Sequence, residues 1–451
     1  MNNYDSKINK IKKNPYLVFF SGFAIIIIIG TVLLALPIST QSGKSAGFFN
    51  ALFTATSATC VTGLVVENTA EYWSVFGKIV ILMLIQIGGL GVMTMTAMIS
   101  FFMGRRISLK TRLLIMEERN IDELQGVVRL TKNILFFTFG VELVGALLFS
   151  LVFIKDYGVA NGIGYSIFHS ISSFCNAGFD LIGNSMINYV DNPIITVAVC
   201  TLVVVGGIGY FVFCDIYENK RWLRLSLHTK LVIVITGVLL ISGTLLVFLL
   251  EHNNPGTMGN LDLSGKINAS IFQAVNPRTA GLNSVPIENL RMATVSIIFV
   301  LMFIGGSPAS TAGGIKTTTF GVLVVSFYNL VKGKRDFEVF ERRILPETTI
   351  RAAAILLLSL MLIIVFSIVL SITEEATGFE YLDILFETIS AFATVGLSRG
   401  LTPFLSNGGK VILSILMFIG RVGPMTVAYA LLKQNRNIGN YTYPEGKVII
   451  G

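Results

Sequence analysis

Charged residues are scarce in this chain of 451 residues: they make up 13% of it, whereas 53% of its residues are hydrophobic. A soluble domain keeps about a quarter of its residues charged, so the composition excludes a soluble globular enzyme and a disordered protein. Cysteine is also rare, with four residues and no paired spacing, which excludes a disulfide framework and a zinc site. The three histidines, His169, His228 and His252, are far apart in the sequence and do not indicate a metal site.

Nucleotide-binding motifs are missing as well. Neither G-x-G-x-x-G nor G-x-x-x-x-G-K-[ST] occurs, and GGIKTT at 313–318 lacks the spacing of the second motif. We therefore exclude an ATP-hydrolysing pump for this subunit alone and expect no cofactor in the chain. The net charge of +8 does not indicate a nucleic-acid partner, because the basic residues lie between apolar runs.

The chain instead contains long apolar runs, and about 20 apolar residues in a helix are enough to cross a bilayer. Segments of this kind lie at 16–38, 76–102, 131–154, 193–217, 229–250, 290–331, 350–372 and 410–432. The first contains an isoleucine run at 25–29 and is too long for a cleavable signal peptide. We expect an all-α polytopic membrane protein with eight transmembrane helices and a lipid-facing surface.

The basic residues indicate how the chain is oriented. Most Lys and Arg residues lie in the two tails and in the loops after the second, fourth and sixth segments, all on one side of the membrane. Cytoplasmic loops carry the excess of these residues, so both termini are expected in the cytoplasm. The opposite loops carry acids such as Glu67, Asp180 and Glu374. These acids either concentrate cations at the outer face or are ordinary outer-loop composition, and both interpretations stay open.

A short motif recurs four times along the chain. Each outer loop between an odd and an even apolar segment holds a semi-apolar stretch that ends near a glycine. The stretches are ALFTATSATCVTGL (51–64), SIFHSISSFCNAGF (166–179), SIFQAVNPRTAGL (270–282) and ILFETISAFATVGL (384–397). Their glycines are Gly63, Gly178, Gly281 and Gly396, each nine or ten residues after a phenylalanine. This regularity predicts four copies of one helix–loop–helix unit.

The four stretches are too short to cross a bilayer. A helix of about 11 residues dips ~16 Å and must return, and returning backbone at membrane depth has to be buried in protein or line a wet path. Four such loops around one axis aim carbonyl oxygens at a common line, which is the construction of a cation selectivity filter. The negative C-terminal ends of the short helices also favour a cation. A single loop of this kind is as often a re-entrant packing element as part of a filter, but four such loops with their glycines in register favour a selectivity filter.

The even segments carry a second repeat, with the sequences IGGLG (87–91), VGGIG (205–209), IGGSP (304–308) and IGRVG (419–423). We expect these glycines midway along the second helix of each unit, where small residues let helices approach closely. Arg421 replaces a glycine in the fourth copy, where an unpartnered charge costs several kcal/mol. It either faces the wet axis below the filter as a positive barrier or pairs with the intramembrane acid Glu142.

The third unit departs from the pattern. Its second segment has 42 residues at 290–331, about twice the length that a straight helix needs to span. It contains GGSPASTAGGIK (305–316), with four glycines and Pro308, and neither residue type favours a helix interior. We therefore expect the helix to open at mid-membrane into a loop that lines a cavity and acts as a gate. Lys316, just after the loop, is expected to reach toward the cytoplasm or nearby carbonyls.

With these loops, Arg421 and the glycine-rich segment, the sequence resembles the Trk/Ktr/HKT superfamily of potassium transporters, most of all its bacterial Ktr-type membrane subunit, over about residues 15–449. The resemblance implies four helix–pore-helix–helix units in pseudo-fourfold arrangement around a central pore. The units are expected at 16–110, 125–222, 228–335 and 346–434, between cytoplasmic tails at 1–15 and 435–451.

The resemblance also implies roles for individual residues. The implied filter strands are Cys60-Val61-Thr62-Gly63, Cys175-Asn176-Ala177-Gly178, Arg278-Thr279-Ala280-Gly281 and Ala393-Thr394-Val395-Gly396. The implied gate consists of Gly305, Gly306, Ser307, Pro308, Ala309, Ser310, Thr311, Ala312, Gly313 and Gly314, with Lys316 and Arg421. Cys60 and Cys175 occupy matching positions and read as small pore-loop side chains. Each strand keeps one glycine, unlike the potassium-channel filter TVGYG, which leaves fewer stacked carbonyl rings.

As function, the resemblance implies K⁺ uptake across the bacterial plasma membrane by a homodimer that a cytosolic nucleotide-binding ring subunit of the KtrA or KtrC type regulates. It also implies stimulation by Na⁺, although no residue pattern here identifies a sodium site. An obligatory Na⁺/K⁺ symporter and a less selective monovalent cation channel stay open as alternatives. An intramembrane enzyme would need a nucleophile or paired acids at one depth, and the apolar segments offer only Glu142.

Overall fold

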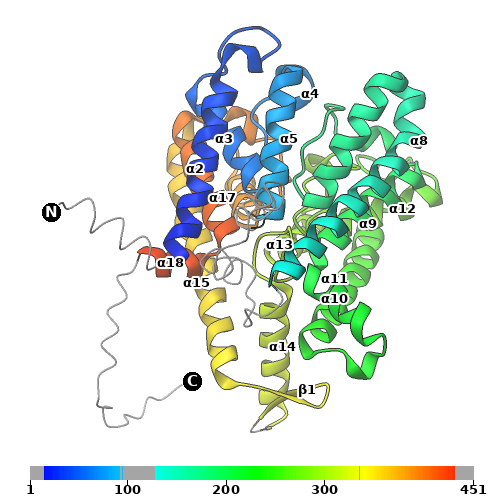
Figure 1. Cartoon of the computed structure of the whole chain (residues 1–451), viewed down its shortest axis with the longest axis vertical. Coiled ribbons are helices and arrows are strands. Elements are labelled where there is room, and N and C mark those ends of the chain that lie inside the picture. The colour runs from blue at the N-terminus through cyan, green and yellow to red at the C-terminus, as the bar shows by residue number, and fades with distance from the viewer. Residues whose placement is uncertain (1–14, 92–93, 95–126, 335, 432–451) are drawn as a thin grey trace, which may run out of the picture.

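The computed structural model describes residues 15–91, 94, 127–334 and 336–431, and Figure 1 shows that this part of the chain consists almost entirely of helices. The expected tails at 1–15 and 435–451, except Pro15, and most of the basic loop after the second segment lie outside the described residues.

The helices fall into four consecutive units, as the repeat predicts. The first unit contains α2 (Pro15–Ala35), α3 (Phe48–Thr59), α4 (Thr69–Tyr72) and α5 (Val75–Leu90). The second contains α8 (Val127–Cys175), α9 (Pro193–Ile208) and α10 (Tyr210–Asn219). The third contains α11 (Leu227–Glu251), α12 (Leu263–Val275), α13 (Met292–Phe303) and α14 (Thr317–Val331). The fourth contains α15 (Pro346–Thr373), α16 (Tyr381–Ala393), α17 (Asn407–Val422) and α18 (Pro424–Leu431). Short 3₁₀ turns lie between them: η1 (Pro37–Ser39), η2 (Ile187–Tyr189), η3 (Trp222–Arg224), η4 (Ile287–Asn289), η5 (Glu375–Thr377) and η6 (Thr402–Phe404).

Each repeated short stretch forms a helix that ends just before its glycine. These helices are α3, α12, α16 and the C-terminal part of α8, which is a separate helix because Gly158 (φ 77°) interrupts the longer one. The phenylalanine that recurs in the repeat explains part of this placement. Phe53, Phe168, Phe272 and Phe386 are at most 3% exposed, so each one anchors its short helix in the protein core.

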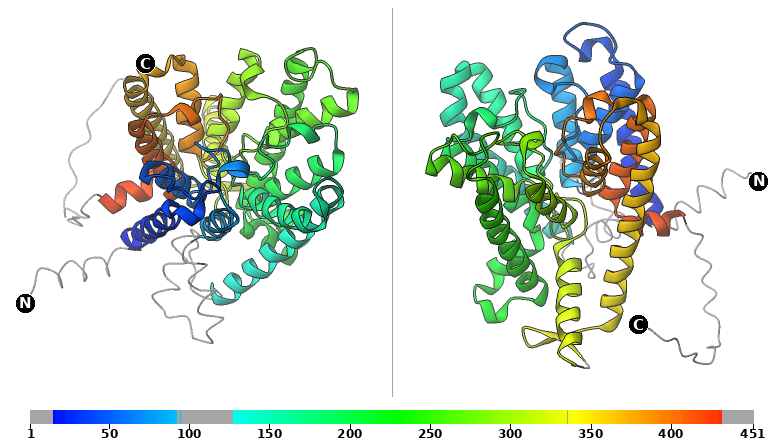
Figure 2. Two further views of the ribbon diagram at one scale, coloured as in Figure 1. Left: turned by 90° about the horizontal axis from the view of Figure 1, so that it is seen from above. Right: turned by 180° about the vertical axis from the view of Figure 1, so that it is seen from behind.

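The four units close into a ring. The second helix of each unit packs against the short helix of the next: α5 against α8, α9 against α12, α13 against α16, and α17 against α3. The last contact joins the fourth unit to the first, and the view from above in Figure 2 shows the units arranged around a common centre. This closed order matches the expected pseudo-fourfold arrangement of a helical membrane transporter.

The second helices of the first, second and fourth units are not the continuous spans that the apolar segments predict, and this expectation was wrong for these three units. α5, α9 and α17 are followed directly by Gly91, Gly209 and Gly423, which have φ values of 86°, 93° and 93°. Glycine at such a position ends a helix because it alone adopts positive φ at no steric cost. α9 and α10 meet at an angle of 85° across Gly209. Only the break in the third unit was expected.

As a result, few described helices can cross a membrane without interruption. Three are long and apolar enough by length and composition: 131–175, α11 and α15. The bent pair of α9 and α10 is a fourth candidate, while the 20–35 part of α2 and helices α5, α13 and α14 are shorter apolar helices.

The first glycine of the second repeat brings the second helix against the short helix of its own unit. A Cβ added at Gly88, Gly206 or Gly420 would collide with the carbonyl oxygen of Thr59, Phe174 or Phe392, respectively. Each of these carbonyls lies four residues before the repeat glycine of its unit. The expected role of these glycines in close packing therefore has a specific partner, the C-terminal end of a short helix.

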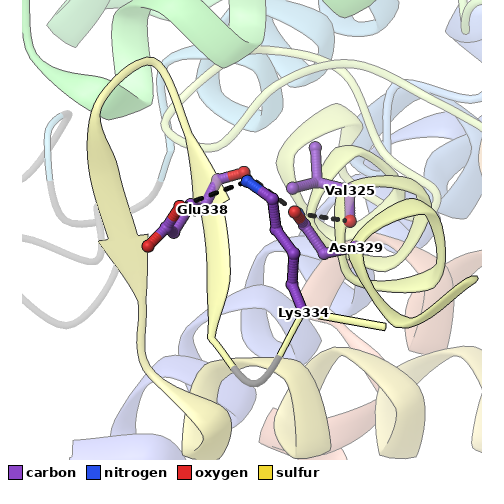
Figure 3. Close-up of polar contacts among 4 residues, drawn as sticks. All are labelled: Val325, Asn329, Lys334 and Glu338. Atoms are coloured by element: carbon purple, nitrogen blue, oxygen red, sulfur yellow. Dashed lines mark hydrogen bonds and ion pairs between the residues drawn. The ribbon is translucent and has the colours of Figure 1, made fainter. Parts of the chain in front are cut away.

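A small hairpin connects the third and fourth units. Its strands, β1 (Phe337–Val339) and β2 (Arg342–Ile344), pair antiparallel and follow α14, which lies beside α15 in Figure 1. Figure 3 shows how the hairpin is held: Asn329 Nδ2 donates to the carbonyls of Val325 and Glu338, both at 2.9 Å. Lys334 Nζ lies 3.3 Å from the Glu338 carboxylate in an exposed ion pair, which contributes little in water.

The contact between Gly420 and Phe392 generates a stability prediction. Replacing Gly420 by Ala forces the Cβ into the Phe392 carbonyl oxygen, and overpacking of this kind costs about 1–3 kcal/mol. Gly237→Ala is the matched control, because a Cβ there meets nothing within 4 Å and alanine is the better helix former by about 1 kcal/mol. Thermal unfolding followed by size-exclusion chromatography should show a lower midpoint for Gly420→Ala and an equal or higher one for Gly237→Ala. Equal midpoints for wild type and Gly420→Ala would contradict this packing.

Candidate functional site

The four expected filter strands share one unusual backbone conformation. The residue two positions before each repeat glycine has positive φ: 57° at Val61, 59° at Asn176, 77° at Thr279 and 52° at Thr394. The glycines Gly63, Gly178, Gly281 and Gly396 have φ values of 94°, 71°, 71° and 90°. Positive φ is uncommon outside glycine, above all at β-branched residues, and clusters of it occur where function requires a strained backbone.

Hydrogen bonds to the short helices fix the orientation of the strand peptides. Thr62 N donates to Ser57 O at 2.8 Å, Ala177 N to Ser172 O at 2.7 Å and Val395 N to Ser390 O at 2.8 Å. In the third strand Ala280 N donates to Asn276 O at 2.9 Å. A trans peptide holds its N–H and C=O on opposite sides. The carbonyls that precede these amides therefore point away from the short helices.

The next peptide is held in the same way in the first and fourth strands. Gly63 N donates to Ser57 Oγ and Gly396 N donates to Ser390 Oγ, both at 3.1 Å. One serine thus accepts two successive amides of its strand, once with its carbonyl and once with its hydroxyl. By the same geometry, the carbonyls of Thr62 and Val395 also point away from the helix side.

The strands meet in a closed ring, which we call the filter ring and define by the four repeat glycines and the residue before each one. A Cβ added at Gly63 would lie 2.6 Å from Ala177 O, and one at Gly281 would lie 2.6 Å from Val395 O. A Cβ at Gly178 would meet Ala280 O, and one at Gly396 would meet Thr62 O. Each glycine thus faces the carbonyl that precedes the next glycine, in chain order and back to the first.

The filter ring therefore collects backbone oxygens from all four units at one place. A ring of carbonyls can replace the water shell of a dehydrated monovalent cation. The C-terminal ends of the short helices lead into the strands and add partial negative charge. The hydroxyls of Thr62, Thr279 and Thr394 are buried here and have no hydrogen-bond partner among the described residues, so the surroundings of the ring are polar.

The side chains of Cys60, Cys175 and Arg278 belong to the filter strands but lie outside the filter ring as defined. Cys60 and Cys175 are free and fully buried, and a Cβ at Gly89 would lie 2.5 Å from Cys175 Sγ, so this thiol fills space between helices. Arg278, which is 7% exposed, donates from a terminal guanidinium nitrogen to Gly305 O at 3.3 Å. It ties the third strand to the start of the 305–314 loop.

The expected intramembrane loop lies between α13 and α14, and hydrogen bonds attach it to the second unit. Ser307 N donates to Gly207 O at 2.9 Å and Thr311 N donates to Gly206 O at 3.2 Å. Thr311 Oγ1 donates to Phe174 O at 3.2 Å, and Tyr210 N donates to Ala309 O at 3.3 Å. The loop thus uses the carbonyls that become available where α9 ends.

The remaining loop residues close the loop upon itself and place it next to the fourth strand. Thr317 N donates to Gly306 O at 2.9 Å, and Lys316 Nζ donates to Ala312 O at 2.7 Å. Lys316 was expected to reach either toward the cytoplasm or toward nearby carbonyls, and in the structure it binds the nearby carbonyl of Ala312. A Cβ added at Gly313 would collide with the Thr394 side chain, which places this part of the loop against the filter.

Arg421 connects the loop to two other units. It lies in the last turn of α17, which ends at Val422, and not at the middle of a continuous helix as expected. Its guanidinium donates to the carbonyls of Thr311 in the loop and Gly88 in α5. The alternative partner, Glu142, instead accepts a hydrogen bond from Gln86 Nε2 at 3.0 Å, and no ion pair joins it to Arg421 within the described residues.

The sequence interpretation missed the helix breaks that create this arrangement. Gly91, Gly209 and Gly423 each follow the first glycine of their motif by three residues. This last glycine of the motif was visible in the sequence, and its recurrence as a helix terminator was the available signal. Without the breaks, the carbonyls that accept from the loop and from Arg421 would be occupied within helices.

Comparisons with known proteins agree on the family. The sequence matches the TrkH family, described as cation transport protein, over residues 12–439. It is 44% identical to Ktr system potassium uptake protein B of Bacillus subtilis, covering 99% of both chains. It is 42% identical to potassium/sodium uptake protein NtpJ of Enterococcus hirae, covering 97% of both. The crystal structure of the potassium transporter TrkH from Vibrio parahaemolyticus has the same fold, with a TM-score of 0.71 at 18% identity over 92% of this chain and 85% of that one.

The filter ring predicts a cation-dependent stability. A ligand that binds only the folded state raises its stability, so K⁺ should raise the unfolding midpoint relative to choline at equal ionic strength. Gly63→Ala should abolish this difference, because its Cβ would lie 2.6 Å from Ala177 O. Gly43→Ala is the control: Gly43 also has positive φ, at 68°, but a Cβ there meets nothing within 4 Å. If Gly63→Ala keeps the full K⁺ effect, the ring does not hold the ion.

Proposed function

The chain belongs to the TrkH family of cation transport proteins, which are not enzymes, and from that premise we propose that it takes up K⁺ across the bacterial plasma membrane. The single observation that carries this proposal is the filter ring. Four strands with the same backbone angles turn their carbonyls to one place, each glycine facing the oxygen that precedes the next. K⁺ uptake is also the activity after which the Bacillus subtilis relative, Ktr system potassium uptake protein B, is named.

The proposed path runs through the filter ring and is closed below it by the 305–314 loop. The loop touches the fourth filter strand at Thr394 and is held by Arg421 through the carbonyl of Thr311. A positive side chain beneath a carbonyl ring opposes the passage of a cation. Conduction then requires that the loop and Arg421 separate, while the filter ring stays in place.

We further propose that the chain is the ion-translocating subunit of a Ktr-type system, as the names of its relatives suggest. It would act as a homodimer with both termini in the cytoplasm, and a cytosolic nucleotide-binding ring subunit would regulate it. Its lipid-facing surface carries exposed apolar side chains, such as Ile28, Leu147 and Ile241.

A sodium-linked mechanism is the second candidate function. One relative that covers nearly the whole chain is named a potassium/sodium uptake protein, and each filter strand here has only one glycine. Na⁺ would then act as an activator, as an obligatory co-substrate, or as a second permeant ion in a less selective channel.

Uptake of Rb⁺ by proteoliposomes that contain the purified chain tests the proposal. We expect uptake driven by an inside-negative voltage and inhibited by external K⁺. Equal uptake with and without Na⁺ would remove obligatory coupling, whereas strict dependence on Na⁺ would favour the symporter. An absence of cation-specific flux would contradict the proposed function itself.

The contact between Arg421 and the loop predicts a gain of flux. Arg421→Ala removes the positive charge and both hydrogen bonds to backbone carbonyls. Rb⁺ uptake should therefore rise about tenfold or more at unchanged expression, since one charge-assisted hydrogen bond is worth about 1.5–3 kcal/mol and about 1.4 kcal/mol is tenfold. Arg421→Lys retains the charge but has no planar guanidinium to reach both carbonyls. This variant therefore distinguishes the effect of the charge from the effect of the two hydrogen bonds to Thr311 and Gly88. Arg342→Ala, at an exposed hairpin position, is the control. Reduced uptake by properly inserted Arg421→Ala would show that Arg421 is not part of a closed gate.

A further inference from the structure

Two acidic side chains of α16 have no part in the mechanism described so far. Asp383 and Glu387 are four residues apart and therefore lie on one face of the helix. Glu387 is fully buried, although burying a carboxylate is costly unless it is well hydrogen-bonded. Its hydrogen-bond partners are Ser398 and Thr402, which belong to the segment after the fourth filter strand.

Both acids hold the segment that directly follows the fourth filter strand. Glu387 Oε1 accepts from Ser398 Oγ, and Oε2 accepts from Thr402 Oγ1 at 2.9 Å. Asp383 Oδ1 accepts from Arg399 Nε at 2.6 Å in an ion pair whose side chains are only 15% and 11% exposed. Ser398 Oγ also accepts from Gly400 N at 3.0 Å. Ser398 is two residues beyond Gly396 of the filter ring.

The fourth filter strand is therefore fixed to α16 at both of its ends. At its inner side, Ser390 accepts the amides of Val395 and Gly396. At its outer side, Glu387 fixes Ser398 and Thr402. Gly396 lies between these two attachments, and the carbonyl of Val395 before it faces Gly281.

Comparison of the four units shows that this attachment differs among them. The residue after the recurrent phenylalanine is Thr54, His169, Gln273 or Glu387 in the four units. His169 is fully buried and accepts from Leu181 N through Nε2 at 3.3 Å, while its Nδ1 donates to Tyr165 O at 2.7 Å. The second unit thus holds its own segment after the filter with a neutral acceptor. In the part of the chain that the structure describes, the side-chain amide of Gln273 has no hydrogen-bond partner.

We propose that Glu387, supported by Asp383, is a positioning residue for the fourth filter strand and sets the preference for K⁺ over Na⁺. Because a carbonyl ring discriminates between ions through the spacing and field of its oxygens, a strand released at its outer end would fit the smaller ion more readily. The inference rests on the proposed K⁺ uptake and adds a determinant of selectivity outside the ring.

The test uses the full-length chain in proteoliposomes and measures the KM and maximal rate of Rb⁺ uptake, together with inhibition by Na⁺. Glu387→Gln and Ser398→Ala should each raise the KM for Rb⁺ about tenfold, the equivalent of one charge-assisted hydrogen bond, and strengthen inhibition by Na⁺. The maximal rate should stay within about twofold, because the gate is untouched. The double variant Glu387→Gln/Ser398→Ala should have a KM for Rb⁺ no higher than that of either single variant, since both substitutions affect the same contact between Ser398 and Glu387.

Matched variants distinguish positioning from general damage. Glu380→Gln removes an exposed carboxylate at the start of the same helix, whose side chain makes no cap hydrogen bond, and should behave as wild type. Ser398→Thr keeps the hydroxyl and should restore the preference for K⁺. If Glu387→Gln does not accumulate in the membrane, the KM for Rb⁺ and the Na⁺ inhibition of Ser398→Ala and Asp383→Asn test the proposal in its place.

The outcomes separate this inference from the function on which it rests. Wild-type Rb⁺ uptake with an unchanged KM and unchanged Na⁺ inhibition in Ser398→Ala overturns the role of Glu387 and leaves K⁺ uptake intact. If wild type itself shows no Rb⁺ flux, the proposed function fails and this inference fails with it.

Discussion

The close approach of four glycines is the constraint on which the rest of this molecule depends. Gly63, Gly281 and Gly396 each face a carbonyl of the neighbouring strand at a distance that leaves no room for a Cβ, and at Gly178 a Cβ would lie 3.2 Å from Ala280 O. Since each strand comes from a different unit, the four units have to be in register before any of them can complete its part of the ring. The packing of each second helix against the next short helix supplies that register. The ring contacts and the helix contacts therefore stabilise one another.

The membrane makes the direction of every peptide in the filter strands significant. Backbone polar groups at this depth have to be satisfied within the protein or along a wet path. The short helices satisfy the amides, above all through the carbonyl and hydroxyl of Ser57 and Ser390. They leave the opposite carbonyls pointing away from the short helices. One set of hydrogen bonds thus both stabilises a strained backbone and fixes the direction of its carbonyl dipoles, which is the direction that a cation site requires.

Much of this arrangement could be predicted from the sequence because it follows from repetition. The spacing of Gly63, Gly178, Gly281 and Gly396 predicts four equivalent turns, and the length of the stretches predicts that they re-enter. What could not be predicted was the fate of the second helices. Glycine in an apolar segment is compatible with close packing and with a helix end, and the motif contains glycines of both kinds. Gly88 packs against Thr59 O while Gly91 ends the helix, and only the structure assigns these uses.

The breaks in the second helices also explain how asymmetric contacts form beside a ring that is nearly symmetric. Ending α5 at Leu90 and α9 at Ile208 leaves the carbonyls of Gly88, Gly206 and Gly207 available to side chains and loops of other units. The loop of the third unit takes two of them, and Arg421 of the fourth unit takes the other. Within the described residues, α5, α9 and α17 end before equivalent glycines, whereas the long loop belongs to the third unit and the arginine of this motif to the fourth. In the function proposed above, an ion path of fourfold character would therefore be closed by two features that each come from a single unit, the 305–314 loop and Arg421.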